Sequence, residues 1–460
     1  MTTDPQVKPV RRSATVATFL SFLWPGLGQL YAGARRTALI FGLPLLVVVL
    51  VVALQLLGGA QALLLQMLTP STALTVLILI VLFGIWRLVA MGDALGTAGR
   101  DGSWRRPIPM AAFLALAIVV VGTHAAAANI AWSFYQADRG IFVGIHDPDT
   151  AVLPTLGVAP SGAPARSVAP GSSPAAASDP PPAAPRINIL LTGIDSDENR
   201  AHALTDTLLV ASLDPTTGDL AMVSFPRDMS RLPTPDGKRF DAKINSLLTY
   251  ADRHPDKYPG GGMSALMTEV GFLLGAKIDY YASVDLDGFR KLIDRVGGVT
   301  VDVQTAIDDP GYGGWDTPGK IGFKLTTGKH ELDGEHALAF VRTRKGIGDS
   351  DFGRARRQQQ LLVALQRKLV DPAMLPSLPG LLDDATKTLK TNFPPDRLGE
   401  VLDVARRIDD GAVRKYVLGP PYSTHPTNLA TYILVPDMDK IAKLSINIFG
   451  GASAYAGQPE

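Results

Sequence analysis

The sequence lacks cysteine entirely, and its formal net charge over 460 residues is only +1. Without cysteine the chain has no disulfide bond, no thiolate metal site and no cysteine nucleophile. A net charge near zero gives no reason to expect nucleic acid, whose partners normally carry a basic domain. The chain also has no GxxxxGK[ST] loop, and no GxSxG motif outside residues 147–185. These absences argue against a nucleotide triphosphatase and a serine hydrolase.

Apolar residues make up 46% of the chain, and they are concentrated in its first third. Three stretches approach the roughly 20 apolar residues that cross a bilayer, namely residues 37–57, 71–91 and 110–134. A further apolar stretch, residues 17–33, is broken by Pro25, Gly26 and Gly28, which is typical of a hairpin or re-entrant segment. We therefore predict a membrane region over residues 1–135.

Basic residues flank these stretches unequally. Lysines and arginines lie before the first stretch and between the second and third, whereas residues 58–70 carry no charge. The positive-inside rule then places the N-terminus and residues 92–109 in the cytoplasm. Three crossings carry everything after Phe134 outside the cell. We therefore expect a multi-pass protein of the cell membrane whose C-terminal part is extracellular.

The polar part of the chain begins with a predicted linker over residues 136–185. Most of it, residues 147–185, consists of Pro, Ala, Ser and Gly, which cannot bury enough apolar surface to offset chain entropy. Residues 186–450 have the composition of a globular domain, and residues 451–460 form a short tail.

The globular part alternates strand-like and helix-like patterns. Runs rich in leucine and β-branched residues predict strands at 186–195, 206–214, 220–228, 280–285 and 298–303. Helical periodicity predicts helices at about 263–275, 286–296, 333–340, 352–370, 396–409 and 437–447. Strands with interleaved helices predict an α/β fold, in which helices cover the faces of a sheet.

Basic residues gather in "FVRTRKGIGDSDFGRARRQQQ", residues 340–360, which contains five arginines. We expect a helix to begin near Phe352, with Ser350 or Asp351 as its N-terminal cap. The buried stripe of this helix is predicted to consist of Leu361, Leu362, Leu365 and Leu369.

Arg354 occupies a position on this stripe where a leucine would be expected. Gln358 lies on the same stripe, Arg357 lies at its edge and Arg356 points away. Arginines in a first helical turn also oppose the helix dipole. A local rule broken without local compensation indicates a functional site.

The residues before this helix add two further arginines. If "VRTRK" is extended, Arg342 and Arg344 project to one face and converge on whatever Arg354 faces. Guanidinium groups at a helix N-terminus suit phosphate oxygens, so we predict a diphosphate-binding site. The alternative is that these arginines pair with Asp349 and Asp351 as a solvated ion network.

Acidic residues lie at the ends of the predicted strands. Asp195 ends the first, Asp206 opens the second, and Arg227 and Asp228 end the third. Ligands collect at the carboxyl ends of strands in open α/β sheets. Carboxylates beside arginines would bind a hard cation such as Mg²⁺ that is shared with phosphate. The alternative is that each aspartate is a turn or cap residue.

A series of motifs in residues 186–450 resembles the catalytic domain of the LytR-CpsA-Psr family. In order, they are "GID", "TDTLLV", "SFPRD", "KINSL", "LDGFRKLIDRVGGVTVDV", "KLTTGKHELDGEHALAFVRTR" and "DFGRARRQQQ". The resemblance implies an extracellular three-layer α/β domain with a central mixed sheet. It also implies a phosphotransferase that moves a glycopolymer from a polyprenyl-pyrophosphate carrier to a hydroxyl of peptidoglycan. A phosphodiester forms, polyprenyl phosphate is released, and Mg²⁺ or Mn²⁺ is the cofactor.

The resemblance also assigns residues by motif. The pyrophosphate ligands would be Arg227, Arg342, Arg344, Arg354, Arg357 and Gln358. Asp195 and Asp206 would hold the metal ion. Catalytic roles fall to Asp206, Arg227, Asp228 and Arg354, with Asp206 and Asp228 both candidates to accept the proton of the attacking hydroxyl.

The chain departs from the family pattern in two places. The family usually has an arginine two residues after the "GID" aspartate, whereas this chain has Asp197 there, so that Arg200 is the nearest substitute. The family also commonly has one membrane span. Two alternatives therefore stay open, namely hydrolysis of the pyrophosphate by water, or binding of the lipid pyrophosphate without turnover by a membrane-anchored regulator.

A lipid-linked substrate also requires an apolar cleft. We expect this cleft between sheet and helices, lined from residues 263–275 and 361–370. The alternative is that both segments are ordinary core helices.

Overall fold

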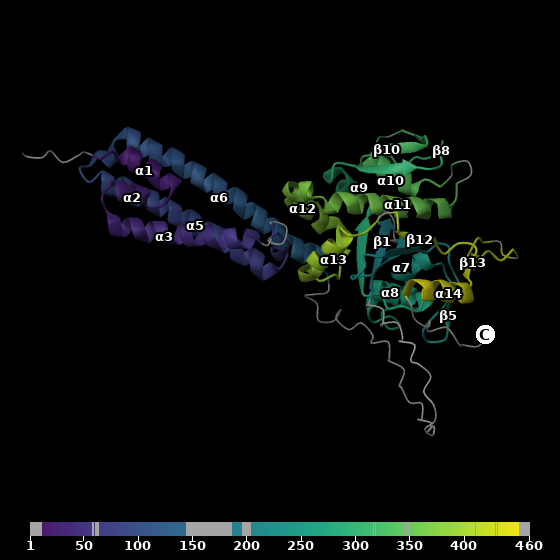
Figure 1. Ribbon diagram of the computed structural model, residues 1–460. Helices are drawn as coiled ribbons and strands as arrows, with labels where there is room; N and C mark the ends of the chain where they lie inside the picture. The colour runs from purple at the N-terminus through teal and green to yellow at the C-terminus, as the bar shows by residue number, and fades with distance from the viewer. Residues whose placement is uncertain are drawn as a thin grey trace, which may run out of the picture. The chain divides into compact units, whose positions relative to one another are not determined.

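The computed structural model is shown in Figure 1. It describes residues 12–57, 59, 64–143, 186–195, 204–315, 317, 319–344, 346, 349–409, 411–427, 429 and 431–449. The chain divides into two units, Met1–Asp138 and Arg139–Glu460, which are described in turn.

The first unit is helical. Helices α3 (Arg35–Leu57), α5 (Pro70–Ala98) and α6 (Pro107–Ile141) are long and apolar enough to cross a membrane, and each contains one of the predicted spans. Within residues 17–33, helix α1 (Ala14–Leu23) ends before Pro25, and α2 (Leu27–Tyr31) follows Gly26. The φ angle of Gly26 is 102°, a left-handed conformation that favours glycine.

The last of these helices is longer than the sequence pattern suggested. Helix α6 continues past Phe134 to Ile141, so the described chain is helical where the linker was predicted to begin. Arg139 in its last turn interacts favourably with the helix dipole. Phe142 then forms a parallel bridge with Thr391. Residues 144–185 and 450–460, which include most of the predicted linker and the whole predicted tail, lie outside the described residues.

The second unit is built on a six-stranded sheet of order β11-β6-β1-β2-β3-β12. Its strands are β1 (Ile187–Asp195), β2 (Leu204–Leu213), β3 (Leu220–Ser224), β6 (Tyr280–Asp285), β11 (Leu389–Thr391) and β12 (Arg414–Val417). The pairs β1–β2, β2–β3 and β6–β11 are antiparallel, whereas β1–β6 and β3–β12 are parallel. The central sheet is therefore mixed, as expected.

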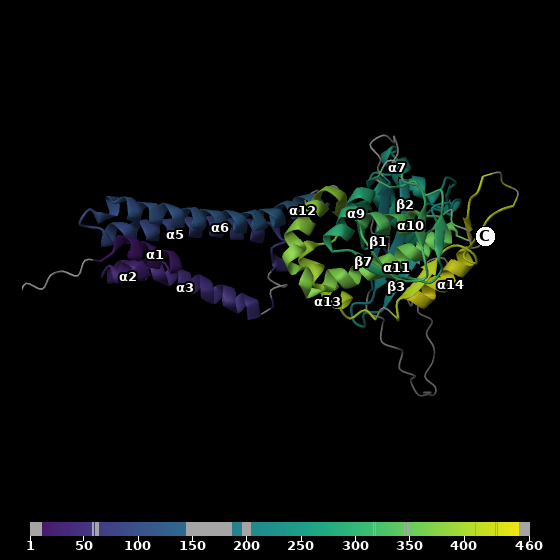
Figure 2. The same cartoon turned by 90° about the horizontal axis from the view of Figure 1, so that it is seen from above.

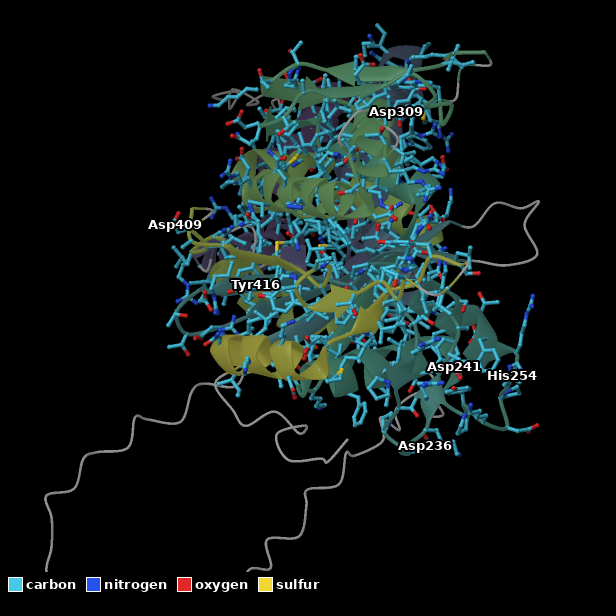
Figure 3. The ribbon with its side chains drawn as sticks, turned by 90° about the vertical axis from the view of Figure 1, so that its right-hand side faces the viewer. Asp236, Asp241, His254, Asp309, Asp409 and Tyr416 are labelled. Atoms are coloured by element: carbon cyan, nitrogen blue, oxygen red, sulfur yellow. The ribbon has the colours of Figure 1, made fainter. Side chains whose placement is uncertain are left out.

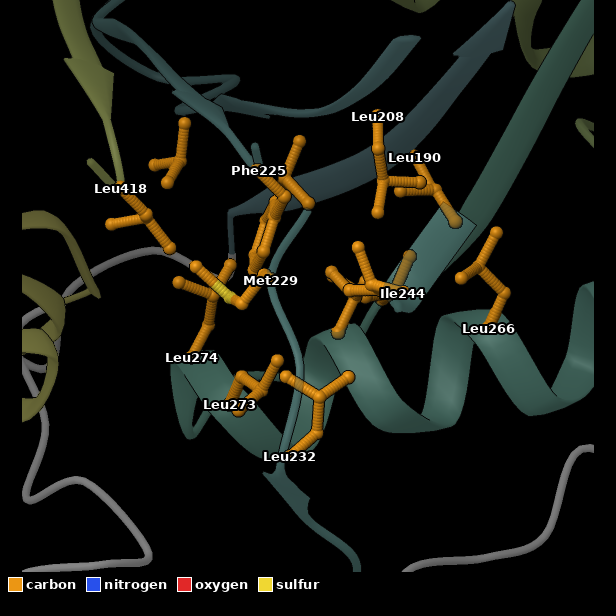
Figure 4. Packing of buried hydrophobic residues seen from close by; sticks show 14 of the residues in the cluster. Leu190, Leu208, Phe225, Met229, Leu232, Ile244, Leu266, Leu273, Leu274 and Leu418 are labelled. Carbon is orange, nitrogen blue, oxygen red and sulfur yellow. The ribbon is translucent and has the colours of Figure 1, made fainter. Parts of the chain in front are cut away.

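Helices cover both faces of this sheet, which gives three layers (Figures 1 and 2). One face carries α9 (Leu286–Arg295), α10 (Gly334–Arg342) and α11 (Asp351–Val370). The other carries α7 (Leu247–Asp252), α8 (Gly261–Leu274) and α14 (Met438–Phe449). The strands contribute to a hydrophobic core on each face of the sheet, because successive side chains of a strand point to opposite faces. Leu190 and Leu208 join the core on the α8 face (Figure 4), whereas Leu209 packs with Val363 of α11.

Several elements differ from the sequence prediction. Strand β7 (Val299–Val303) forms where it was predicted, but it pairs with β10 (Gly328–Leu332) in a separate two-stranded sheet. The central sheet instead gains the short strands β11 and β12, which carry no strong strand pattern. Helix α12 (Leu378–Thr388) was not predicted, and α13 (Leu398–Ala405) is shorter than residues 396–409.

Helix α8 carries a buried acid on an otherwise apolar face. Glu269 is 4% exposed, and its Oε1 has no hydrogen-bond partner among the described residues. Burial, with a smaller contribution from the charge of Asp236, raises the pKa of Glu269 to about 8. The carboxyl is therefore mainly protonated at neutral pH.

This raised pKa predicts a pH-dependent stability. Below pH 4.5 Glu269 is protonated in both the folded and the unfolded chain, and the folded state carries no penalty for its ionisation. As the pH rises towards 8, only the unfolded chain loses its proton readily, and stability falls by up to about 4 kcal/mol. Thermal unfolding of the full-length protein in detergent at several pH values should show this decline. Glu269→Gln should remove it, and equal pH profiles for the two proteins would contradict the prediction.

Candidate active site

A cavity of about 350 Å³ lies between the sheet and helices α9, α10 and α11. Most of its wall is apolar, with side chains from Leu191, Ala282, Val284, Phe289, Leu292, Leu338, Val341, Leu361, Leu362 and Leu365. The expectation of an apolar cleft lined by residues 361–370 is thus confirmed. The expectation for residues 263–275 was wrong, because α8 packs on the opposite face of the sheet. Leu369 is also 39% exposed and lies outside the buried stripe of α11.

The same cavity is polar in one part. It is bordered by four of the five arginines that the sequence singled out as ligands, together with one glutamine and two aspartates: Arg227, Arg342, Arg344, Arg354, Gln358, Asp206 and Asp285. These side chains come from α10, α11, β2, β6 and the segments that follow α10 and β3. A single cavity therefore joins a long apolar wall to a cationic end.

Arg354 is placed by the first turn of α11. The helix begins at Asp351, and the Ser350 hydroxyl accepts a hydrogen bond from the backbone N–H of Gly353 at 3.1 Å. Arg354 is only 7% exposed, and its Nη2 lies 3.3 Å from Oδ1 of Asp351. Arg356 is exposed, so the predicted orientation of the helix is confirmed.

Burial of the Arg354 guanidinium lowers its pKa from the ordinary value. The carboxylate of Asp351 opposes this shift, whereas the neighbouring guanidinium of Arg227 adds to it. Two cations therefore act on each other across the cavity wall. Their mutual repulsion would be relieved by an anion bound between them.

Arg227 follows strand β3 and lies within a row of alternating charges. Its Nη1 donates a hydrogen bond to Oδ1 of Asp206 at 3.2 Å, and its Nε lies 3.7 Å from Oδ2 of Asp228. Asp228 is buried and also accepts a hydrogen bond from Nζ of Lys243. Asp206 borders the cavity, whereas Asp228 lies behind Arg227 and does not.

Asp206 owes its position to a β-bulge. Gly193 pairs with Thr207 and Ile194 pairs with Thr205, so Asp206 is the extra residue on β2. A bulge redirects the side chain of its extra residue, and bulges are common beside active sites. Asp195 ends β1 opposite Leu204, two positions before Asp206 on the neighbouring strand. The two acids predicted as metal ligands thus come from adjacent strand ends.

Arg357 has a different place from the one expected. Its Nη1 and Nη2 donate to the two carboxylate oxygens of Asp349 at 3.0 and 2.8 Å, and its Nε donates to the Phe340 carbonyl at 2.8 Å. Nη2 also donates to the carbonyl of Thr343. These bonds hold Arg357 outside the cavity, so the assignment of this residue as a pyrophosphate ligand is corrected. The alternative of an ion pair with Asp349 holds for Arg357.

The geometry expected for "VRTRK" also needs correction. Arg342 is the last residue of helix α10 rather than part of an extended segment, because the helix continues through Val341. The chain turns extended only at Thr343, whose hydroxyl donates to Asp309. Arg342 and Arg344 nevertheless both border the cavity, because α10 ends at its polar part.

Sequence reasoning missed two side chains that position the site. Lys243 lies in the quoted "KINSL" motif, and its pairing with Asp228 indirectly fixes Arg227. Gln359 is fully buried, and its Nε2 donates to Ser224 Oγ at 2.8 Å and to the Tyr416 carbonyl at 2.7 Å. These bonds tie α11 to the sheet next to Arg354. The run of three glutamines was the only available signal for this role.

Some predicted residues are beyond what the structure describes. Asp197 and Arg200 lie outside the described residues, so the departure from the family pattern after "GID" stays a prediction. Within the described ranges, no cluster of three or more His, Asp or Glu side chains forms a metal site by itself.

Comparisons with known proteins include teichoic acid transferases and a biofilm regulatory protein. The chain is 31% identical over 263 residues to the polyisoprenyl-teichoic acid–peptidoglycan teichoic acid transferase TagV of Bacillus subtilis, over 56% of this chain and 62% of that protein. It is 30% identical over 215 residues to the enzyme of the same description, TagU, from Halalkalibacterium halodurans, over 46% of this chain and 63% of that protein. The chain thus spans about three fifths of the length of these relatives.

Solved structures include B. subtilis TagV, at 26% identity and a TM-score of 0.45, over 58% of this chain and 98% of that chain. The family model described as the LytR_cpsA_psr family matches residues 171–441. This match covers more than half of the 460 residues, and the protein therefore belongs to the LytR_cpsA_psr family.

Proposed function

We propose that this protein transfers a glycopolymer from a polyprenyl-pyrophosphate carrier to a hydroxyl of peptidoglycan. The observation that carries the proposal is the cavity in which an apolar wall meets Arg227, Arg342, Arg344 and Arg354. The wall suits the hydrocarbon of a polyprenyl chain, and the arginines suit the two phosphates at its head. The names of TagV and TagU as transferases of teichoic acid to peptidoglycan support the same class of reaction.

The reaction is a phosphoryl transfer. The acceptor hydroxyl attacks the phosphorus that carries the glycopolymer, and the bond from that phosphorus to the bridging oxygen breaks. Polyprenyl phosphate leaves with the bridging oxygen, and a phosphodiester joins glycopolymer and acceptor. Arg354 and Arg227 neutralise charge on the transferred group, and because Arg354 is already desolvated it needs little reorganisation.

Asp206 and Asp228 have different roles in this proposal. Asp206 borders the cavity and has one oxygen on Arg227, so we assign it to binding the cation and to accepting the proton of the attacking hydroxyl. Asp228 is engaged by Lys243 and lies behind Arg227, so we assign it to holding Arg227 in place.

Asp195 and Asp206, which lie at neighbouring strand ends, would hold a divalent cation, because carboxylate oxygens are the ligands that Mg²⁺ and Mn²⁺ prefer. When bound, the cation would supply positive charge at the pyrophosphate.

The three apolar helices support a location in the cell membrane. Under the positive-inside rule, the basic residues before α3 and between α5 and α6 favour the cytoplasmic side for these ends. The second unit then lies outside the cell membrane, where peptidoglycan and a lipid-linked polymer are both within reach.

The first functional prediction concerns Arg354. Arg354→Ala should lower transfer by about 100-fold or more, since a preorganised cation is removed from the transferred phosphate. Arg356→Ala is the matched control, because it removes the same charge from the exposed side of α11 and should leave transfer nearly unchanged. The assay uses full-length protein, Mg²⁺, peptidoglycan and a polyprenyl-pyrophosphate-linked glycan. It measures linked glycan, and it also measures polyprenyl phosphate released without linkage.

The outcomes separate the candidate functions. Linked glycan supports transfer, and release without linkage would indicate hydrolysis by water. An intact carrier in the wild-type protein would indicate a binding protein. Equal rates for Arg354→Ala and wild type would remove the central residue of the proposed site.

Arg357 should behave as a structural residue. Arg357→Ala leaves the nearly buried Asp349 without its partner, which should lower the free energy of unfolding by about 3–5 kcal/mol. Chemical denaturation of the full-length protein measures this loss. The paired variant Arg357→Met with Asp349→Leu should regain most of the stability, because no charge is left unpaired. A stable Arg357→Ala protein that has lost only activity would instead return Arg357 to the ligand set.

The apolar wall should select for lipid. Leu362→Trp fills part of the cavity from α11, so the KM for a long-chain polyprenyl carrier should rise about tenfold. A carrier with a short prenyl chain should be affected much less. Steady-state kinetics with both carriers test this, and equal changes in KM would show that the lipid lies elsewhere.

A further inference from the structure

A second cavity of about 440 Å³ lies beside α8. It is formed by the hairpin of β4 (Leu232–Pro233) and β5 (Arg239–Phe240), the connection between α7 and α8, and α8 itself. None of its lining residues borders the cavity beneath α11. Figure 3 shows Asp236 of this hairpin far from Asp309, which bonds the end of α10 on the other side of the sheet.

The most buried polar residue that lines this cavity is Glu269. This side chain is 96% buried, since only 4% of it is exposed, and its Oε1 has no partner among the described residues. A buried polar atom that lacks a hydrogen bond destabilises the folded protein. A ligand that enters the cavity can supply the missing bond.

The walls next to Glu269 are flat and apolar. Phe240 and Tyr258 line the cavity with Pro235 and Pro259. Tyr258 is fixed by Tyr250, with ring centroids 6.1 Å apart and an interplanar angle of 77°. Small hydroxyl groups are supplied by Ser264 and Thr268 of α8. Aromatic faces beside a few polar groups suit a sugar ring, which has an apolar C–H face and a rim of hydroxyls.

Charge narrows the class of ligand. The rim carries three exposed cations. Lys238 pairs with Asp236 at 3.0 Å and Arg239 pairs with Asp241 at 2.6 Å. Nζ of Lys257 instead lies 5.2 Å from the ring centroid of Tyr258, so the rim has a small excess of positive charge. A ligand with an ammonium group would be repelled by these cations. A small anion without an apolar face would not match the apolar walls around Glu269. Because its pKa is raised to about 8, Glu269 offers both a donor and an acceptor to a neutral hydroxyl at neutral pH.

We propose that this cavity binds one ring of an acidic saccharide chain. A ring hydroxyl bonds the Glu269 carboxyl, the C–H face of the ring lies against Phe240 and Tyr258, and the acidic substituent faces Lys238 and Lys257. This site is separate from the transfer reaction proposed above and does not depend on it. The protein would then bind glycan at two separate sites.

The test measures saccharide binding to the full-length protein in detergent by calorimetry. One probe is a peptidoglycan tetrasaccharide that alternates N-acetylglucosamine and N-acetylmuramic acid, and another is a lipid-free, phosphate-linked glycan oligomer. Neutral chitotetraose serves for comparison. The acidic probe that binds with the higher affinity identifies the source of the saccharide.

Glu269→Leu should weaken binding of that probe by at least about tenfold, while the thermal midpoint rises because an unsatisfied carboxyl has been removed. Glu269→Gln keeps a donor and an acceptor and should retain binding. Met267→Leu, on the core side of α8, is the matched control and should change neither quantity. Arg354→Ala removes binding that depends on the other cavity, and the part of the binding that is sensitive to Glu269→Leu should persist in this background.

Three results would overturn the proposal. The first is that the wild-type protein binds none of the probes. The second is that the Glu269→Leu protein binds as tightly as wild type. The third is that neutral chitotetraose binds as tightly as the acidic saccharides. Each of these results leaves the transfer assay untouched, so failure of this site and failure of the proposed function are distinguishable.

Discussion

The second unit depends on one costly arrangement, the burial of the Arg354 guanidinium in the wall of a largely apolar cavity. A charge in such a place is stabilised only by partners that are fixed in advance. Asp351 on the same helix compensates part of this cost at 3.3 Å, Asp206 and Asp228 contribute less, and Arg227 adds repulsion. Burial still lowers the pKa of Arg354, so an anion bound in the cavity would stabilise its charged form further, and this links the fold to phosphate chemistry.

Helix α11 organises this site because its different faces contact the sheet, the cavity and the connection from α10. Gln359 ties the helix to β3 and β12, Arg354 and the leucines face the cavity, and Arg357 holds the connection from α10. The cations therefore lie on regular structure, whose side chains are fixed by packing and hydrogen bonds. A rigid placement lowers the reorganisation required when charge develops on a phosphate.

The sheet separates two buried ionisable groups of opposite type. Arg354 lies on the α11 face and would be stabilised by a bound anion, whereas Glu269 lies on the α8 face and is mainly neutral at physiological pH. Each lines its own cavity, and no residue is shared between the two. Two ligands could therefore be bound at once, because a mixed sheet with helices on both faces offers two independent interior surfaces.

Local periodicity was enough to predict much of this protein. Three apolar runs indicated the long helices, and alternation and helical spacing located β1, β2, β6, α9 and α11. The same spacing placed Arg354 on the buried side of α11 and Arg356 on its exposed side. These features follow from residues near in sequence, whose relative directions are fixed by the geometry of a single helix or strand.

Only the tertiary structure decided which partners each side chain meets. Arg357 carries the same charge as Arg354, yet its guanidinium donates hydrogen bonds to Asp349 and to the carbonyls of Phe340 and Thr343. These two carbonyls are available because α10 ends at Arg342. Asp206 faces the cavity because β2 gains one residue against β1, and β7 leaves the central sheet because β10 pairs with it. Such partners come from segments distant in sequence, and a pattern along one segment carries no information about where another segment ends.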